Sequence, residues 1–323
     1  MKFAFIIDPI AQLDPTHDTS VALMEAAQEQ GHDVWITQVE WLSVIESEAW
    51  ATLEKVKLEP VKLVAGHWQA EEKWYYLSPP SQQPLAKMDA VFMRKDPPFN
   101  VPYLYASQIL DLLNQETTLV VNSPRGLQTA NEKLYALNFR QFIPETIVSQ
   151  EKQTIRKFVE AKGTGVFKPL GGYGGKGILV VKAGDRNLNS LVEISTKSGQ
   201  EPIIVQAYLP EASAGDKRII LLDGKPIGAV NRIPSSSEFR GNMAVGGTVA
   251  ATEITPREQE ICAAVGPKLK ADGLYFVGLD VIGGYLTEVN VTSPTGIREI
   301  DRLDNTNLGQ KVMKWVEETM GKV

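Results

Sequence analysis

Cysteine and histidine are scarce in this chain of 323 residues, which contains one cysteine and three histidines. A lone cysteine excludes a disulfide within the chain. Cys262 lies in a stretch with helical periodicity, which favours a small buried side chain over a nucleophile. The three histidines form no evident Ser/His/Asp or Cys/His arrangement. We therefore do not expect covalent catalysis by a serine or a cysteine.

Long apolar runs and basic blocks are also missing. No run approaches the length that spans a membrane, and no signal peptide precedes the first strand pattern. The net charge is −6 with both signs interspersed, and no basic–aromatic alternation suggests nucleic acid. We expect a soluble, cytoplasmic protein with no membrane or nucleic-acid partner. Hydrophobic residues make up 43% of the chain, which is enough for two or three domains.

The first 122 residues alternate short apolar runs with helical patterns, which is typical of a parallel α/β domain. The runs at residues 2–8 and 90–94 each end in a loop that contains proline and charged residues. Loops at the carboxyl ends of parallel strands are where α/β folds bind ligands. The second loop, residues 94–99 (RKDPPF), could face a substrate or only solvent, and the sequence favours neither.

A glycine-rich segment at residues 171–177 (GGYGGKG) joins two strand patterns, at residues 165–168 and 178–181. Glycines let backbone amides approach phosphate oxygens closely. The segment is neither a Walker loop nor a Rossmann fingerprint, because it lacks GK[ST] and a strand follows it. Such a hairpin alone is a weak signal, but Lys168 directly precedes it within an apolar strand. A buried lysine is costly unless an anion meets it, so the combination indicates a phosphate site.

Residues 277–290 alternate apolar and polar residues on both sides of a Gly-Gly pair, which predicts an antiparallel hairpin. The hairpin would bring Asp280 close to Thr287 and Glu288, so that three oxygen-bearing side chains converge, and Asn290 would lie on the same face as Glu288. Two carboxylates and an amide oxygen suit a hard cation that also binds phosphate. A solvated hairpin face is the alternative, but the polar loop at residues 292–296 favours a nucleotide–metal site.

Three further segments fit the same centre. Arg218 and Arg232 lie on neighbouring predicted strands and suit the negative charge of a metal–phosphate centre, although either alone could be a surface residue. Residues 203–208 (IIVQAY) form a strand pattern that could offer backbone groups to an adenine edge. Residues 235–247 are small and glycine-rich with Arg240 inside, which is typical of a mobile flap or of a plain disordered loop.

The order of these features resembles the bacterial glutathione synthetase family of the ATP-grasp superfamily. The resemblance covers essentially the whole chain and rests on DPI near the N-terminus, MRKDPPF, NEKLYA, GDKR, RIP, RGN and EVNVTSPTGIREI. Each motif alone is unspecific, whereas the combination is specific.

The resemblance implies an α/β fold in which an N-terminal parallel α/β domain precedes a two-lobed ATP-grasp fold. The N-terminal domain would span residues 1–122, and the central lid domain with the glycine-rich hairpin residues 123–202. The C-terminal ATP-grasp domain, with the metal site and the flap at 235–247, would span residues 203–323. A helix is expected over residues 127–142. A homo-oligomer, usually a tetramer, is also implied.

The implied reaction is the ATP-dependent ligation of γ-glutamylcysteine and glycine through an acyl phosphate, giving glutathione, ADP and phosphate. Another ATP-grasp carboxylate–amine ligase, such as a dipeptide ligase, is the alternative. It would keep the metal and phosphate residues but should lack MRKDPPF and TSPTGIRE. A nucleotide-binding regulator without catalysis would tolerate the loss of Arg232 or Glu288, and both are present.

The resemblance also assigns roles to residues that match the family's motifs. The catalytic arginines would be Arg232, Arg218 and Arg240. The ATP-binding residues would be Lys133, Lys168, Gly171, Gly172, Tyr173, Gly174, Gly175, Gln206, Tyr208, Leu209, Asp216 and Arg218. The peptide substrate would contact Asn290, Ser293, Thr295 and Arg298. The metal, Mg²⁺ with Mn²⁺ as an acceptable substitute, would be held by Asp280, Glu288 and Asn290.

Overall fold

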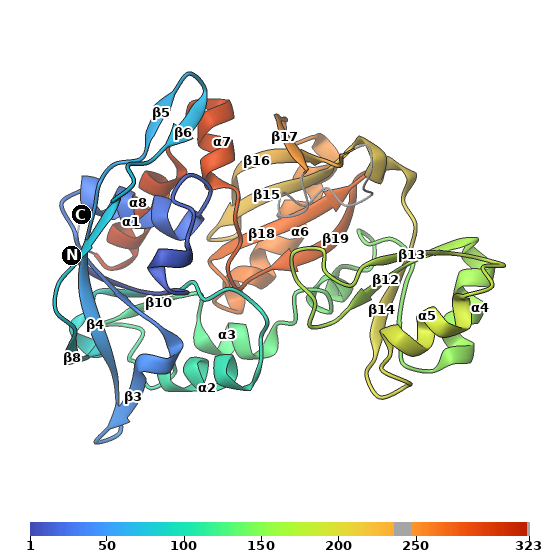
Figure 1. Cartoon of the computed structure of the whole chain (residues 1–323), viewed down its shortest axis with the longest axis horizontal. Coiled ribbons are helices and arrows are strands. Elements are labelled where there is room, and N and C mark those ends of the chain that lie inside the picture. Colours follow the sequence, from blue (N-terminus) through green and yellow to red (C-terminus); the bar gives the residue numbers. More distant parts are fainter. Residues whose placement is uncertain (236–246, 322–323) are drawn as a thin grey trace.

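The computed structural model describes residues 1–235 and 247–321. Residue Arg240 and nearly all of the expected flap at 235–247 lie outside these residues. The described chain forms an N-terminal α/β domain, a central ATP-grasp sheet and a lid (Figure 1). None of its helices is long and apolar enough to cross a membrane.

The N-terminal domain contains an eight-stranded sheet in the order β10-β9-β1-β2-β4-β3, with β7 and β8 also paired to β4. Its core is parallel, because β1 lies between β2 and β9, and β9 pairs with β10 in the same direction. The strands are β1 (Lys2–Ile6), β2 (Asp33–Thr37), β3 (Leu42–Ile45), β4 (Glu48–Leu58), β7 (Tyr75–Leu77), β8 (Ser81–Pro84), β9 (Ala90–Met93) and β10 (Leu119–Val121). The helices are α1 (Thr19–Glu29) and α2 (Val101–Leu110). A separate two-stranded arm is made of β5 (Lys62–Val64) and β6 (His67–Gln69).

The lid is a four-stranded sheet in the order β11-β14-β12-β13, covered by two helices. Its elements are β11 (Thr146–Ser149), α4 (Lys152–Lys162), β12 (Thr164–Pro169), β13 (Leu179–Lys182), α5 (Leu188–Ser195) and β14 (Ile203–Ala207). It has a core of its own, centred on Ile155, Phe167 and Val205. Because β14 lies in this sheet, the lid extends past the expected boundary at residue 202.

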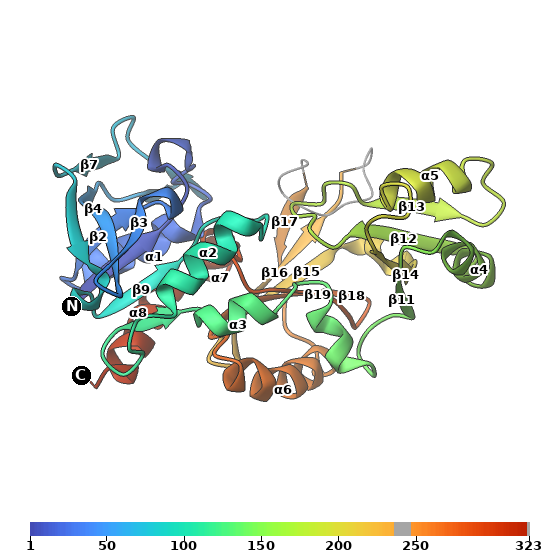
Figure 2. The ribbon, with the colours of Figure 1, turned by 90° about the horizontal axis from the view of Figure 1, so that it is seen from below.

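The ATP-grasp sheet has five antiparallel strands in the order β17-β16-β15-β18-β19. They are β15 (Asp216–Leu222), β16 (Lys225–Ile233), β17 (Thr248–Ala251), β18 (Phe276–Ile282) and β19 (Tyr285–Asn290). Helix α6 (Pro256–Ala271) covers one face of the sheet, and the other side opens toward the lid (Figure 2). Helices α7 (Ile297–Asp304) and α8 (Leu308–Thr319) complete the chain. Alternation along β15 places Ile219 and Leu221 in the core with α6, while Arg218 faces the lid side.

The helix expected over residues 127–142 is wrong. Helix α3 (Pro124–Thr129) ends early, and a 3₁₀ helix, η4 (Tyr135–Phe139), begins after a turn. Within that turn the Asn131 side-chain oxygen accepts hydrogen bonds from the amides of Lys133 (3.1 Å) and Leu134 (3.0 Å). An asparagine bonded to its own following backbone competes with a continuing helix. The turn therefore places Glu132 and Lys133 outside any helix, with Glu132 against the end of β19 and the Lys133 ammonium bonded to Gly172 of the lid.

Helix α8 packs on α1 of the N-terminal domain, which brings the two ends of the chain to the same side of the molecule (Figure 1). The approach is close at Gly309, where an added Cβ would lie 2.9 Å from the Cβ of Ala26. The N-terminal domain and the ATP-grasp sheet also share two hydrophobic cores, one holding Ala4 with Leu279 and the other Phe3 with Val316. These two parts therefore form one packed body, to which the lid is attached.

Candidate active site

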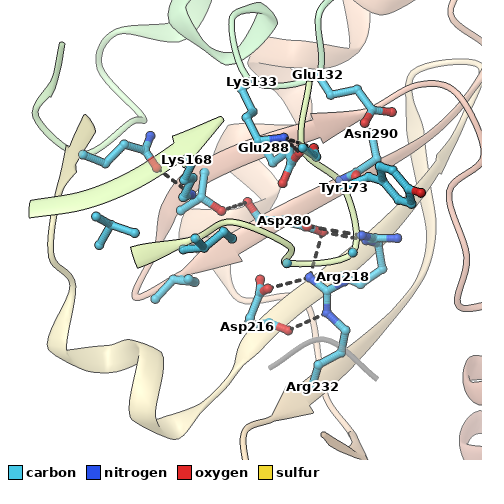
Figure 3. Close-up of a pocket in the computed structure, with 18 of the residues that line it drawn as sticks. Glu132, Lys133, Lys168, Tyr173, Asp216, Arg218, Arg232, Asp280, Glu288 and Asn290 are labelled. Carbon is cyan, nitrogen blue, oxygen red and sulfur yellow. Dashed lines mark hydrogen bonds and ion pairs between the residues drawn. The ribbon is translucent and has the colours of Figure 1, made fainter. Parts of the chain in front are cut away.

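A cavity of about 400 Å³ lies between the lid sheet and the ATP-grasp sheet (Figure 3). One end is apolar and is formed by Val166, Ile178, Val180, Leu209 and Ile282. The other end is densely charged, and its residues come from both sheets and from the turn after α3. An apolar slot beside a charged region suits a ligand with a flat ring and a phosphate chain.

The glycine-rich hairpin joins β12 to β13 and borders the cavity through Gly172, Tyr173, Gly174 and Gly175. Gly174 and Gly175 have φ angles of +58° and +75°, which side chains rarely adopt. The glycines are therefore needed for the turn itself. Gly171 does not line the cavity.

Lys168 lies in β12 opposite Ile204 of β14 and is 9% exposed. Its ammonium donates a 2.7 Å hydrogen bond to the Gln206 side-chain oxygen. Burial lowers the pKa of Lys168, and the charge of Glu288 partly offsets that effect. A lysine on this strand thus faces the cavity, as the sequence predicted, and Gln206 holds it.

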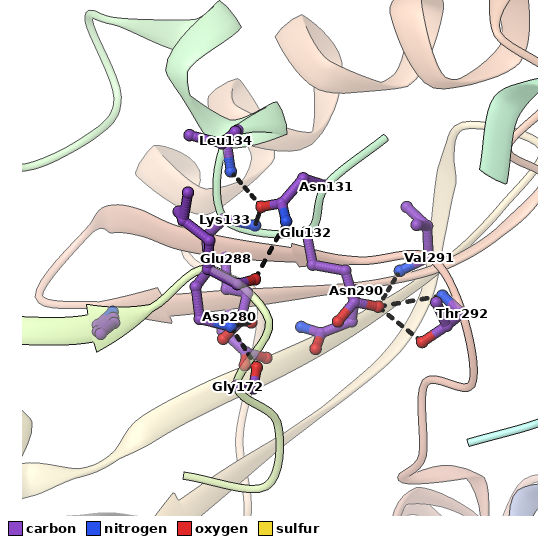
Figure 4. A network of polar contacts seen from close by, with 12 residues as sticks. Asn131, Glu132, Lys133, Leu134, Gly172, Asp280, Glu288, Asn290, Val291 and Thr292 are labelled. Atoms are coloured by element: carbon purple, nitrogen blue, oxygen red, sulfur yellow. Dashed lines mark hydrogen bonds and ion pairs between the residues drawn. The ribbon is translucent and has the colours of Figure 1, made fainter. Parts of the chain in front are cut away.

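Lys133 connects three parts of the cavity. Its ammonium donates hydrogen bonds to the Glu288 carboxylate at 2.9 Å and to the Gly172 carbonyl at 2.6 Å (Figure 4). It therefore links the turn after α3 to the end of β19 and to the glycine-rich hairpin. Lys133 is also buried, so its charge acts with little screening by solvent.

Two arginines and two aspartates alternate across β15, β16 and β18. Register places Arg218 opposite Asp280 and Asp216 opposite Arg232. Arg218 holds Asp280 through two hydrogen bonds of 2.6 and 3.2 Å. Arg232 lies 2.6 Å from an Asp216 oxygen and 3.0 Å from Asp280, so it bridges both carboxylates.

Opposing effects set the pKa values of the two aspartates. Burial raises the pKa of Asp216 to about 6, although Arg232 counteracts the rise. Burial would also raise the pKa of Asp280, but Arg218 and Arg232 together hold it below its ordinary value. Asp280 therefore stays ionised to a lower pH than Asp216.

The residues expected to hold a metal lie together at the end of the β18–β19 hairpin. Asp280 is opposite Glu288 in the register, and Asn290 is opposite Gly278. The Asn290 side-chain nitrogen donates to the Gly278 carbonyl at 3.3 Å, which leaves its oxygen as the atom for a ligand. Two carboxylates and an amide oxygen fit a hard divalent cation. The described residues contain no group of three or more histidine, cysteine, aspartate or glutamate side chains arranged for a metal, so this mixed set is the candidate.

Two backbone amides beside the apolar slot already donate hydrogen bonds within the protein. The amides of Ala207 and Tyr208 donate to the carbonyls of Glu145 (2.8 Å) and Thr164 (3.2 Å). Tyr208 and Leu209 border the cavity, as expected for an adenine site. The side chain of Gln206 bonds Lys168 and Thr146, so its contribution lies in holding the lysine.

The expected peptide-substrate residues divide into two groups. Asn290, Ser293 and Thr295 line the cavity. Arg298 does not: it is buried against Glu25 of α1, and the Trp68 indole donates a 2.7 Å hydrogen bond to its carbonyl. Its guanidinium joins α7 to the N-terminal domain.

Two further residues that line the cavity, Asp96 and Glu132, were given no defined role by the sequence patterns. Asp96 belongs to the RKDPPF loop, for which a substrate-facing position was one of two alternatives, and burial raises its pKa. Glu132 had only one available signal, its position next to Lys133.

Two family models and several relatives match nearly the whole chain. The models for the N-terminal domain and the ATP-grasp domain of prokaryotic glutathione synthetases match residues 1–128 and 132–305. A glutathione synthetase from Nostoc sp. is 64% identical over 320 residues, which is 99% of each chain. One from Thermosynechococcus vestitus is 62% identical over 316 residues, covering 98% of this chain and 99% of that one.

Solved structures show the same fold at low identity. The ATP-grasp ligase PsnB, complexed with a minimal precursor, Mg and ADP, has a TM-score of 0.62 and 17% identity, with 99% of this chain and 98% of that chain covered. The D-cycloserine synthetase DcsG has a TM-score of 0.65 and 14% identity, with 99% and 100% covered. At such identities the likeness establishes the ATP-grasp fold alone.

Proposed function

Because this chain belongs to the prokaryotic glutathione synthetase family, we propose that its cavity joins γ-glutamylcysteine to glycine at the expense of ATP. The chain is an ATP-dependent ligase, and the products of the proposed reaction are glutathione, ADP and phosphate. One observation carries the proposal. A single cavity brings the glycine-rich hairpin, Lys133, Lys168 and the Arg218–Arg232 pair around one set of oxygen ligands.

The chemistry explains why ATP is required. A free carboxylate does not acylate an amine at neutral pH, because its oxygen is too poor a leaving group. Transfer of the γ-phosphoryl group to the cysteinyl carboxylate of γ-glutamylcysteine forms an acyl phosphate. The glycine amine then attacks the carbonyl carbon, the amine loses a proton, and phosphate leaves. Positioning and electrostatics can supply the catalysis of such a transfer.

The cationic side chains would act at different points along the phosphates of ATP and the reacting carboxylate. Lys133 and Lys168 would hold phosphate oxygens, covered by the glycine-rich hairpin. Arg232, which bridges Asp216 and Asp280, would stabilise the charge that develops on the transferring group and on the tetrahedral intermediate. Arg218 would support the phosphates, and its hydrogen bond to the Thr295 carbonyl also steadies the substrate loop.

Asp280, Glu288 and Asn290 would hold Mg²⁺, and Mn²⁺ suits the same oxygens. When bound, the cation neutralises phosphate charge during transfer. The carboxylates are held by Arg218 and Lys133, so both are oriented beforehand. Cytoplasmic location and a tetramer complete the proposal; family resemblance supports both, and light scattering would test the tetramer.

Incubation with ATP, Mg²⁺, γ-glutamylcysteine and glycine should release phosphate and glutathione in equal amounts. Glu288→Gln should lower the rate by about a hundredfold or more, because it weakens the phosphate clamp while the chain stays folded. Glu260→Gln is the matched control, since Glu260 is exposed and pairs with Arg257 one turn away on α6. Near-wild-type rates for Glu288→Gln at saturating Mg²⁺ would remove the metal assignment.

A second experiment distinguishes glutathione synthesis from the reaction of another dipeptide ligase. If phosphate release required a carboxylate substrate other than γ-glutamylcysteine, another dipeptide ligase would be the better assignment. Omission of each substrate in turn, with phosphate and peptide quantified together, separates the two outcomes.

A further inference from the structure

Glu132, which borders the cavity, accepts several hydrogen bonds from residues at and just beyond the end of β19. One oxygen of its carboxylate accepts from the amides of Val291 (2.9 Å) and Thr292 (3.1 Å) and from the Thr292 hydroxyl (2.8 Å), as Figure 4 shows. Its backbone carbonyl accepts from the amide of Val289 at 2.9 Å. Backbone and side chain of Glu132 thus bind three residues at the end of β19.

The bonded residues lie between two groups of the proposed site. Asn290 is the last residue of β19, and Ser293 follows Thr292 directly. Beyond Asn290 the strand has no ladder partner, so its amides need another acceptor. Glu132 supplies that acceptor.

The next residue, Lys133, connects the same turn to the lid. Lys133 bonds Glu288 and the Gly172 carbonyl. Asn131 fixes the turn through its bonds to the amides of Lys133 and Leu134. The turn at residues 131–134 therefore contacts three parts of the cavity: strand β19, the loop at residues 291–292 and the glycine-rich hairpin.

We infer that Glu132 is a positioning residue that sets Asn290 and Ser293 for metal and peptide substrate, and that it is not a third metal carboxylate. The identities of metal and peptide in this inference rest on the proposed function. The three hydrogen bonds to one oxygen hold the Glu132 carboxylate against the chain just beyond β19. What the position needs is an acceptor oxygen, and the negative charge is secondary.

Glu132→Gln and Glu132→Ala separate these requirements. Glutamine keeps an acceptor oxygen for the two amides and the hydroxyl, whereas alanine removes it. Glu151→Ala is the matched control, because Glu151 likewise accepts from two backbone amides, of Gln153 and Thr154, but at the start of α4. The measurements are the Mg²⁺ dependence of ADP binding by calorimetry, KM for γ-glutamylcysteine against kcat, and the melting temperature.

Glu132→Ala should raise both the Mg²⁺ concentration for half-maximal ADP binding and KM for γ-glutamylcysteine by about tenfold to a hundredfold. Glu132→Gln should stay within about threefold of the wild type, since rescue by an acceptor is the mark of positioning. Glu151→Ala should lower the melting temperature without changing either quantity.

The inference is overturned if Glu132→Gln loses Mg²⁺-dependent binding as fully as Glu132→Ala, since charge would then be the requirement. Wild-type values for Glu132→Ala would also overturn it. Should Glu132→Ala fail to fold, Glu132→Gln and Thr292→Val still decide, because Thr292→Val removes one of the three donors and should give a smaller shift in the same two quantities. If the wild type makes no glutathione, the proposed function fails, while the calorimetry still tests Glu132.

Discussion

Lys168 places an ammonium group inside β12, where burial opposes its charge and lowers its pKa. Among residues 1–235 and 247–321 its ammonium donates one hydrogen bond, to Gln206, which leaves two of its three N–H donors for a ligand. The same residue that is costly for the fold is therefore suited to bind an anion. This conflict between stability and site chemistry is local to one side chain.

Lys168→Met should weaken ATP and ADP alike, by about tenfold or more, because a charge-assisted contact is lost in a dry site. The melting temperature should stay the same or rise, since the buried charge is gone. Lys182→Met, at the exposed end of β13, is the control. Calorimetry with both nucleotides checks the expectation, and unchanged ADP affinity would contradict it.

The glycine-rich hairpin depends on its backbone conformation. Three of its glycines, Gly174, Gly175 and Gly177, have positive φ angles, so the turn depends on a conformation that side chains disfavour. The bond from Lys133 to the Gly172 carbonyl links the hairpin to the turn after α3. Its shape, and not any one of its side chains, is what would cover the terminal phosphate.

Gly175→Val should therefore depress turnover and weaken a non-hydrolysable ATP analogue while leaving ADP affinity closer to normal. Valine at φ +75° is strained by about 1–2 kcal/mol, which distorts the turn. Gly171→Ala is the control, because an added Cβ there meets nothing within 4 Å and the residue does not line the cavity. Equal losses for ADP and the analogue would mean that the hairpin does not single out the γ-phosphate.

At the scale of the molecule, the first and last parts of the chain are joined by polar as well as apolar contacts. Asn122, at the end of β10, bonds the Phe276 amide and carbonyl and the Val291 carbonyl. Arg298 pairs with Glu25 across the same boundary. We expect the N-terminal domain and the ATP-grasp sheet to unfold together for this reason, with the lid as a separate core.

The pH dependence of that joint unfolding has a specific test in α7. Burial raises the pKa of Asp301 to about 6, and its carboxylate accepts from the Leu308 amide and the Thr306 hydroxyl. Because the folded pKa lies above the unfolded value of about 4, the folded state binds more protons between these values. The stabilising contribution of Asp301 is complete below about pH 4 and is lost as the pH rises through about 6.

Asp301→Asn keeps an acceptor and removes the titration, so its gain in unfolding free energy over the wild type should be larger near pH 7.5 than near pH 5. Urea unfolding of both proteins at the two pH values measures this difference. Contributions of His32 and Asp216, whose pKa values are also shifted, cancel in the comparison. Asp304→Asn, exposed at the end of the same helix, should show no such change.

Local sequence patterns predicted both hairpins that border the cavity. Alternation around a Gly-Gly pair predicted the β18–β19 hairpin, and the strands Phe276–Ile282 and Tyr285–Asn290 confirm it. The two-residue turn by itself would place Asp280 opposite Thr287, and an irregularity between Asp280 and Val281 shifts the register by one residue, so that Asp280 lies opposite Glu288. Lys168 ahead of the glycine-rich segment is another local signal that the structure places at the cavity.

The contacts of Arg298 and Glu132, by contrast, depend on the tertiary fold. Both stand beside motif residues in the sequence, yet Arg298 is buried against Glu25, 273 positions away, and Glu132 binds the amide of Val291, 159 positions away. The turn at Asn131 interrupted a pattern whose apolar periodicity indicated a continuous helix. Local patterns fix dihedral angles and turn register, whereas the partner of a buried charge depends on which distant segments the core brings together.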